Sequence, residues 1–189
     1  MSTWKERLHQ LGLILEESDP RPGISRYHNM PYAIFRYPPE DEFVVRAETA
    51  RLRTRLEQRG KRVTAISLAE LLRAALHSLP FANLVEAERS VGLDEAIETA
   101  HAGLSHYTPL DDLVLKAMPA NGMFNTDVVF IVRAGALFPM YRTSALLEQL
   151  MGKVHVPTIL FYPGELDGAS GLRFMGVLDA EHNYRPKIF

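Results

Sequence analysis

The run Asp127–Val132 (DVVFIV) is apolar at five consecutive positions and decides the fold class. Successive side chains of a strand point to opposite faces of its sheet, so a continuously apolar run needs cover on both faces. Parallel sheets between two layers of helices provide that cover, whereas a half-exposed antiparallel strand alternates between apolar and polar residues. We therefore expect 127–132 to be a central strand of a mostly parallel sheet flanked by helices.

Three further stretches have the composition of strands. They contain β-branched and aromatic residues, and prolines follow the first of them at 38–39 and the last at 163. Helical patterns separate the stretches, and this alternation is typical of βαβ units. We expect strands at 32–37, 62–66 and 157–162, the last of them ending at Pro163-Gly164.

The spacing of apolar residues, together with prolines and glycines, predicts the helices and loops. Trp4, Leu8, Leu11 and Leu15 recur at helical spacing and indicate an amphipathic helix over 3–17. The segment 67–125 is helical in pattern and forms an insertion between the second and third strands. The other expected elements are a loop at 18–31, a helix from Pro39 to Gly60, breaks in the insertion at Pro80, at Gly92 and near 106–108, a helix capped by Thr108 with Pro109 in its first turn, a loop at 133–139 and a helix at 140–150.

The C-terminal segment predicts an antiparallel hairpin. Strand-like residues at 172–178 and 184–189 flank the polar stretch 179–183. A chain of 189 residues can bury one full hydrophobic core, and we find no linker or internal repeat that would divide it. We therefore expect a single α/β domain over 1–189.

Composition excludes several classes of function. The 21 Lys and Arg nearly balance the 23 Asp and Glu, so no strong overall field draws the chain to nucleic acid or to an anionic membrane. The absence of cysteine excludes disulfides, Cys-ligated zinc, iron–sulfur clusters and a thiol nucleophile. No signal peptide or membrane-spanning run is evident, and we expect a cytoplasmic protein.

Polar residues follow two of the predicted buried strands. Ligands of open α/β sheets collect outside the carboxyl ends of parallel strands, which here are the loops at 133–136 and 163–168. If the two strands are neighbours, a cationic loop faces an acidic one and could bind a phosphate or a charged group of a partner. Alternatively, the loops satisfy their charges with each other or with water. The candidate binding residues are Gly135, Arg142, Glu165, Asp167 and Arg133.

Other motifs do not indicate a complete metal, phosphate-binding or catalytic site. Glu165 and Asp167 could contribute to a magnesium site, but no third ligand accompanies them. Gly152-Lys153 lacks the upstream glycine of a phosphate-binding loop, and the glycines at 168 and 171 are spaced one residue too closely for a nucleophile elbow. His101 and His106 are five residues apart, so they do not share a helix face. The sequence therefore offers no catalytic residue, metal site or cofactor.

A row of arginines is the one basic patch that the sequence suggests. Arg51, Arg55 and Arg59 recur every four residues, and Arg62 follows. Such a row could contact phosphates of DNA, but neighbouring glutamates dilute it and no aromatic residues are interleaved for base stacking. A solvated helix face is the simpler interpretation, so direct binding of nucleic acid is not expected.

Several motifs together resemble one protein family. They are Pro31–Phe35 with Pro39 and Glu40-Asp41, then Asp127–Val132, Gly135, Phe138-Pro139 and Arg142, then Leu160–Gly168, and finally Asn183-Tyr184-Arg185. The chain resembles the BrxB proteins of bacteriophage-exclusion (BREX) defence systems, most strongly over 127–189. It departs from the family pattern at Val132, Arg133 and Ser144, so a glycine-cradled phosphate site is not implied.

The resemblance implies a small accessory protein without established catalytic residues. It is encoded with an alkaline-phosphatase-like protein, an ATPase and a DNA adenine methyltransferase, and it helps bacteria to block phage replication. We expect a non-catalytic adaptor that contacts the phosphatase-like protein first, or else the ATPase or the methyltransferase. The alternatives are a nucleotide- or phosphate-binding enzyme or sensor that uses the loops after 127–132 and 157–162, and a DNA-binding module.

Overall fold

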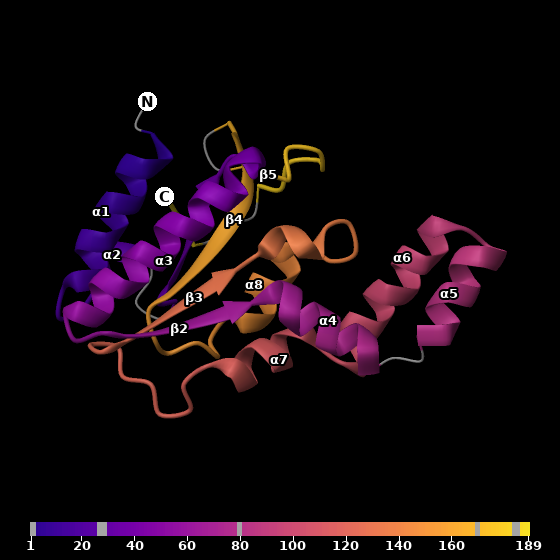
Figure 1. Cartoon of the computed structure of the whole chain (residues 1–189), viewed down its shortest axis with the longest axis horizontal. Helices are drawn as coiled ribbons and strands as arrows, with labels where there is room; N and C mark the ends of the chain where they lie inside the picture. The colour runs from indigo at the N-terminus through magenta and orange to yellow at the C-terminus, as the bar shows by residue number, and fades with distance from the viewer. Residues whose placement is uncertain (1–2, 26–29, 79–80, 169–170, 183–185) are drawn as a thin grey trace.

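The central sheet is mixed but mostly parallel. The computed structural model describes residues 3–25, 30–78, 81–168, 171–182 and 186–189. The strands run in the order β2-β3-β4-β1-β6, and β5, which is outside this order, pairs with β4. Figure 1 labels β2, β3, β4 and β5. All pairs are parallel except β4 with β5. The bounds are β1 Tyr32–Tyr37, β2 Arg62–Ser67, β3 Asp127–Val132, β4 Thr158–Asp167, β5 Gly171–Phe174 and β6 Lys187–Ile188.

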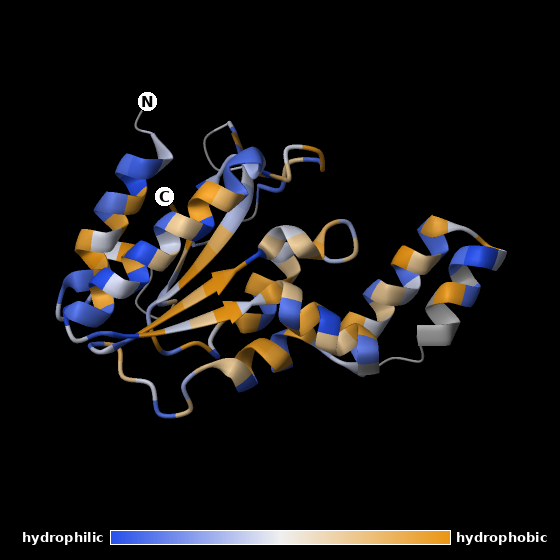
Figure 2. Ribbon diagram, in the orientation of Figure 1, coloured by the Kyte–Doolittle hydropathy of each residue, from blue (hydrophilic) through white to orange (hydrophobic). Residues whose placement is uncertain are grey.

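Helices cover both faces of the sheet, as the apolar strands require. On one face, α1 (Trp4–Glu16), α2 (Arg21–Ile24) and α3 (Glu42–Gln58), which follows the short turn η1 (Pro39–Asp41), pack on one set of strand side chains. On the other, α4 (Leu68–Ser78), η3 (Ala134–Leu137), α7 (Leu110–Ala117) and α8 (Thr143–Leu150) pack on the alternate set. Apolar residues colour the strands and the inner sides of these helices (Figure 2). The predicted fold class is confirmed.

Part of the insertion lies away from the sheet. Helices α5 (Phe81–Ser90) and α6 (Leu93–Ala102) pack side by side and form an arm at the end of α4 (Figure 1). The chain then passes through one π-helical turn, η2 (Gly103–Tyr107), before α7 returns it to the sheet. The predicted breaks at Gly92 and near 106–108 are confirmed, whereas Pro80 lies outside the described residues.

Several boundaries differ from the sequence-based expectation. The expected loop at 18–31 includes α2, and the loop at 133–139 includes the 3₁₀ turn η3. The helix at 140–150 begins only at Thr143, three residues late. Pro109, not Thr108, is the N-cap of α7. These differences are short helical turns within loops or shifts at the first residues of helices, where the sequence specifies helix boundaries least well.

The expected end of β4 is wrong. The strand continues through Pro163 and Gly164 to Asp167. Pro163 lies opposite Tyr37, the last residue of β1, so the missing N–H of proline falls where this ladder ends. Its carbonyl accepts a hydrogen bond from the Met175 N–H at 2.9 Å. Proline therefore marks a change of partner in this strand and does not end it.

The expected partners of the C-terminal hairpin are also wrong. The antiparallel hairpin consists of 164–167 of β4 and 171–174 of β5. The segment 187–188 joins β1 as a parallel edge strand, and 183–185 lie outside the described residues. Because β4 extends beyond β1 and β3, the N–H and C=O groups of its last residues need another partner. The next strand in the sequence, β5, provides it.

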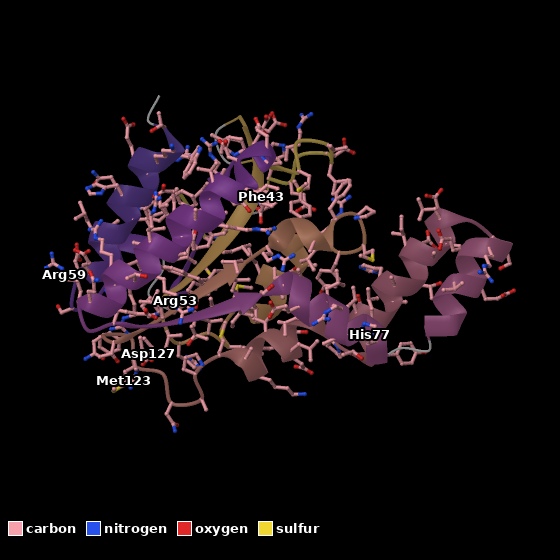
Figure 3. All side chains as sticks on the ribbon, in the orientation of Figure 1. Phe43, Arg53, Arg59, His77, Met123 and Asp127 are labelled. Atoms are coloured by element: carbon pink, nitrogen blue, oxygen red, sulfur yellow. The ribbon has the colours of Figure 1, made fainter. Side chains whose placement is uncertain are left out.

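A buried carboxylate holds the amino ends of β2 and β3. Asp127 is 3% exposed and lies beside Met123 (Figure 3). Its carboxylate accepts hydrogen bonds from Arg62 Nε at 2.9 Å, Arg62 Nη2 at 2.6 Å, the Met123 N–H at 2.8 Å and the Thr126 hydroxyl at 3.2 Å. The hydrogen bonds from Arg62 are the main reason that the pKa of Asp127 lies below its ordinary value.

Candidate functional site

The turn after β3 packs against β4 at the carboxyl edge of the sheet. The β3 strand ends at Val132, and Arg133 then adopts a left-handed conformation with φ of 61°. A Cβ atom on Gly135 would lie 3.2 Å from Met175 Sδ and 3.4 Å from Pro163 Cγ, so this glycine allows the η3 turn to pack against β4. Adjacent parallel pairing of β3 with β4 is confirmed.

Arg142 binds a carboxylate that the sequence did not indicate. Its Nη1 donates to Glu181 Oε1 at 2.6 Å. Glu181 in turn bridges Leu172 of β5 through backbone hydrogen bonds. Arg142 therefore links the start of α8 to the segment after β5. Glu181 is distant in sequence and lies in the stretch expected to be a hairpin turn, which is why it was missed.

Glu165 and Asp167 lie on the β4–β5 hairpin and not in a loop. Asp167 accepts a long hydrogen bond from Arg173 Nη2 at 3.4 Å, and both side chains are nearly half exposed. Glu165 is exposed, and its charge favours the protonated form of Arg36, although burial dominates and keeps the pKa of Arg36 below its ordinary value. Glu165 and Asp167 thus lie on a paired strand, on either side of Leu166, which is 41% exposed.

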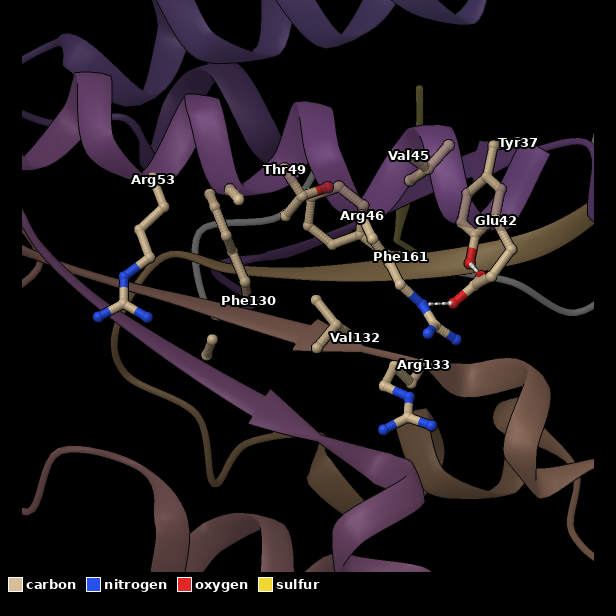
Figure 4. Close-up of a pocket in the computed structure, with 12 residues that line it drawn as sticks. Tyr37, Glu42, Val45, Arg46, Thr49, Arg53, Phe130, Val132, Arg133 and Phe161 are labelled. Atoms are coloured by element: carbon tan, nitrogen blue, oxygen red, sulfur yellow. Dashed lines mark hydrogen bonds and ion pairs between the residues drawn. The ribbon is translucent and has the colours of Figure 1, made fainter.

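A pocket lies between α3 and the carboxyl halves of β2 and β3. Its volume is about 190 Å³. Helix α3 forms one wall, and the sheet forms the floor (Figure 4). The residues that line it are Tyr37, Glu42, Val45, Arg46, Thr49, Ala50, Arg53, Ala65, Phe130, Val132, Arg133 and Phe161.

Three arginines surround this mostly apolar pocket. Arg46 Nε donates to Glu42 Oε1 at 2.7 Å, and Glu42 also accepts a hydrogen bond from the Tyr37 hydroxyl. Burial, and then the hydrogen bond to Glu42, raise the pKa of Tyr37 above its ordinary value. Arg53 Nε donates to Glu57 at 2.8 Å. Arg133 forms no ion pair within the described part of the chain.

Sequence reasoning found only Arg133 among the pocket residues. Glu42, Arg46, Thr49 and Arg53 recur at spacings of four, three and four on one side of α3. That spacing is visible in the sequence, but it becomes informative only when α3 is known to lie across β3. In the arginine row considered for DNA binding, Arg51 and Arg55 lie on other sides of the same helix, Arg59 is its C-cap and Arg62 begins β2.

Intramolecular acids neutralise much of that arginine row. Arg51 pairs with Glu48 at 2.5 Å, Arg55 pairs with Glu16 of α1, and Arg62 pairs with Asp127. The hydrogen bond from Arg55 is the main cause of a lowered pKa at Glu16. The row therefore serves contacts within the fold, and its charge is not a continuous cationic surface.

The described ranges form neither a metal centre nor a membrane-spanning helix. No group of three or more His, Asp or Glu side chains there is arranged to hold a metal ion. Nor does any helix in these ranges have the length and apolar character needed to cross a membrane.

The fold and the site define the class of this protein. The chain is an α/β protein with a mostly parallel sheet between helical layers, an antiparallel pairing of β4 with β5 beyond the carboxyl end of β1, and a pocket between α3 and the sheet that three arginines line. Residues 64–188 match the family model described as "BREX protein BrxB". The chain therefore belongs to the BrxB family.

A curated relative supports this assignment along nearly the whole chain. The "BREX protein BrxB" of Bacillus cereus (strain H3081.97) is 25% identical over 183 residues, which cover 95% of this chain and 94% of the relative. No solved structure matches the chain. The predicted family is confirmed, and membership supports a role in BREX phage defence.

Proposed function

We propose that the chain is a non-catalytic adaptor of a BREX phage-defence complex and binds another component through the β4–β5 hairpin. The observation that carries this proposal is the position of Glu165, Leu166 and Asp167 on a paired strand that projects beyond β1. Antiparallel pairing fixes the backbone of all three residues. A fixed backbone reduces the conformational entropy lost on binding, so these side chains are suitable anchors for a partner.

The composition of the hairpin indicates the chemistry of the partner surface. Glu165 is exposed and Asp167 is partly exposed, and alternation along the strand puts both carboxylates on one face, where they complement a partner surface that carries Lys or Arg. Because the family resemblance places an alkaline-phosphatase-like protein in the same system, we propose that protein as the first partner. The ATPase and the methyltransferase are the second choices. A complex that includes a DNA methyltransferase would be cytoplasmic.

The test is a quantitative binding measurement with purified proteins. The full chain is immobilised, and its affinity for the phosphatase-like protein of the same operon is compared among wild type, Glu165→Ala and Asp167→Ala. Losing one side of a desolvated charge pair costs about 2–5 kcal/mol, so we expect affinity to fall at least tenfold. Glu88→Ala is the matched control, because Glu88 is an exposed carboxylate on α5, in the arm.

Thermal melting of the hairpin variants separates a loss of binding from a loss of folding. Exposed positions usually change the free energy of unfolding by less than about 0.5 kcal/mol, so both hairpin variants should melt like the wild type. Unfolding of these variants would instead make the carboxylates structural partners, for example of Arg173. Normal folding with normal affinity for all three candidate partners would refute the hairpin as the binding surface.

A further inference from the structure

The pocket beside α3 exists because small side chains face one another across it. Protein interiors are normally packed as densely as organic crystals. Here Thr49 and Ala50 of α3 and Ala65 of the edge strand β2 line the pocket, and Ala65 is exposed. No helix among the described residues covers this corner of the sheet. The hollow is therefore open to solvent and already formed in the protein alone.

The size and floor of the pocket suit one planar ring. Phe130 and Phe161 form part of the floor, with ring centroids 5.3 Å apart and an interplanar angle of 72°. The volume of about 190 Å³ is below the range of about 300–1,000 Å³ found for pockets that enclose drug-sized ligands. The space accommodates a single ring system, and the rest of a ligand would extend through the mouth.

Two buried polar atoms at this pocket lack partners. Within the described part of the chain, Thr49 Oγ1 and Arg133 Nε have no hydrogen-bond partner, and Thr49 is only 8% exposed. Buried polar atoms almost always have a protein or water partner, so an unsatisfied atom needs an explanation. A ligand that carries donor and acceptor atoms on its ring, or next to the ring, would supply the missing hydrogen-bond partners.

The mouth of the pocket is cationic, and Arg133 is its free charge. Arg46 and Arg53 already pair with glutamates, whereas Arg133 has no acidic partner among the described residues. The guanidinium groups of Arg46 and Arg133 lie at the same end of the pocket (Figure 4). Arginine binds phosphate and carboxylate through two parallel hydrogen bonds.

Backbone strain marks the same residue. Arg133 has φ of 61°, in the left-handed region that a long side chain seldom adopts. Such strain concentrates at ligand-binding positions. The residue also follows the carboxyl end of a central parallel strand, which is where open α/β sheets bind their ligands.

We propose that this pocket binds a small molecule composed of one planar heteroaromatic ring and one anionic group, the chemistry of a nucleoside monophosphate. The ring enters the apolar floor, and its polar edge supplies a partner for Thr49 Oγ1. The anionic group binds Arg133 at the mouth. This site is distinct from the β4–β5 hairpin of the proposed function, so each proposal can fail without the other.

Titration of the full chain with matched probes tests the proposal. The probes are AMP, GMP, CMP and UMP, the nucleosides without phosphate, ribose 5-phosphate without a ring, and inorganic phosphate. Binding is measured by calorimetry, with thermal shift as the second readout. We expect at least one monophosphate to bind saturably and at least tenfold more tightly than its nucleoside and than ribose 5-phosphate. No saturable binding, or equal binding of ribose 5-phosphate or of the nucleoside, would overturn the proposal.

Variants separate the ring site from the anion site. Arg133→Gln should weaken the monophosphate at least tenfold and leave nucleoside binding unchanged. Ala65→Leu fills the pocket from its exposed side and should abolish binding of both. Arg51→Gln, on another side of α3, is the matched control and should change neither. Equal binding by wild type and Ala65→Leu would place the ligand elsewhere and refute the site.

The same variants distinguish this proposal from the proposed function. Ala65→Leu should retain normal affinity for the protein partner, because the β4–β5 hairpin is unchanged. A further probe, phenylacetate, represents an aromatic side chain beside a carboxylate. Binding of phenylacetate with no binding of any nucleotide would assign the pocket to a side chain of a partner protein and overturn the small-molecule assignment.

Discussion

Replacing Asp127 with alanine should destabilise the fold far more than any exposed acidic residue would. The carboxylate accepts four hydrogen bonds and is almost completely buried. A hydrogen bond to a charged group contributes about 1.5–3 kcal/mol. The Arg62 side chain is 62% exposed, so water replaces its partner and the ion pair contributes less than about 1 kcal/mol.

The larger loss comes from the backbone. The Met123 N–H loses a charged acceptor at 2.8 Å in a partly buried position. Adding the discounted ion pair gives an expected loss of about 2–4 kcal/mol for Asp127→Ala. For a chain of this size each kcal/mol lowers Tm by about 2–4 °C, so the variant should melt about 5–15 °C below the wild type. Asp127→Asn keeps a neutral acceptor and should lose about half as much free energy.

Urea unfolding at several pH values measures these differences, with the exposed Asp179→Asn as the control. Because folding lowers the pKa of Asp127, its contribution is complete above the pKa of the unfolded state, about 4, and is lost as the pH falls through the folded value. The gap between wild type and Asp127→Asn should therefore narrow in acid. A loss below about 1 kcal/mol for Asp127→Ala, or a gap that does not change with pH, would refute this reasoning.

Two further predictions concern packing. Leu56→Ala should lower the free energy of unfolding by about 2–5 kcal/mol in urea, because Leu56 lies on the buried side of α3 and is completely buried; a loss under 1 kcal/mol would mean that the core collapses around it. Gly164→Ala should cost about 1–3 kcal/mol and expose the β4–β5 hairpin to proteases, since the new Cβ would lie 2.4 Å from the Arg173 carbonyl oxygen. Unchanged cleavage would contradict that clash.

The strands could be predicted because their signals are local. The stretches 32–37, 62–66 and 127–132 are short apolar or β-branched runs, and each forms a strand in the structure. The helix α1 was also predictable, because Thr3 and Glu6 form a capping box ahead of a regular apolar stripe. In these segments the local preference and the tertiary environment agree.

The remaining features depend on contacts between distant segments. Pro163 normally ends a strand, but here β4 continues because β1 stops beside it and β5 offers a new partner. The pocket forms only because α3 packs across the sheet, and the pattern of residues within α3 does not predict where on the sheet the helix packs. Arg133 was identified from its place after β3, whereas Arg46 and Thr49 were missed because their importance comes from the opposing strand.

The position of β1 in the sheet has a consequence for synthesis of the chain. It is the first strand to be made, yet its neighbours β4 and β6 both begin after residue 157. Until the ribosome has released those residues, β1 has apolar side chains and unpaired backbone groups without partners. Loop closure over such distances is slow, and exposed strand edges promote association with other chains. Nascent chains of this fold should therefore depend on chaperones until translation is nearly complete.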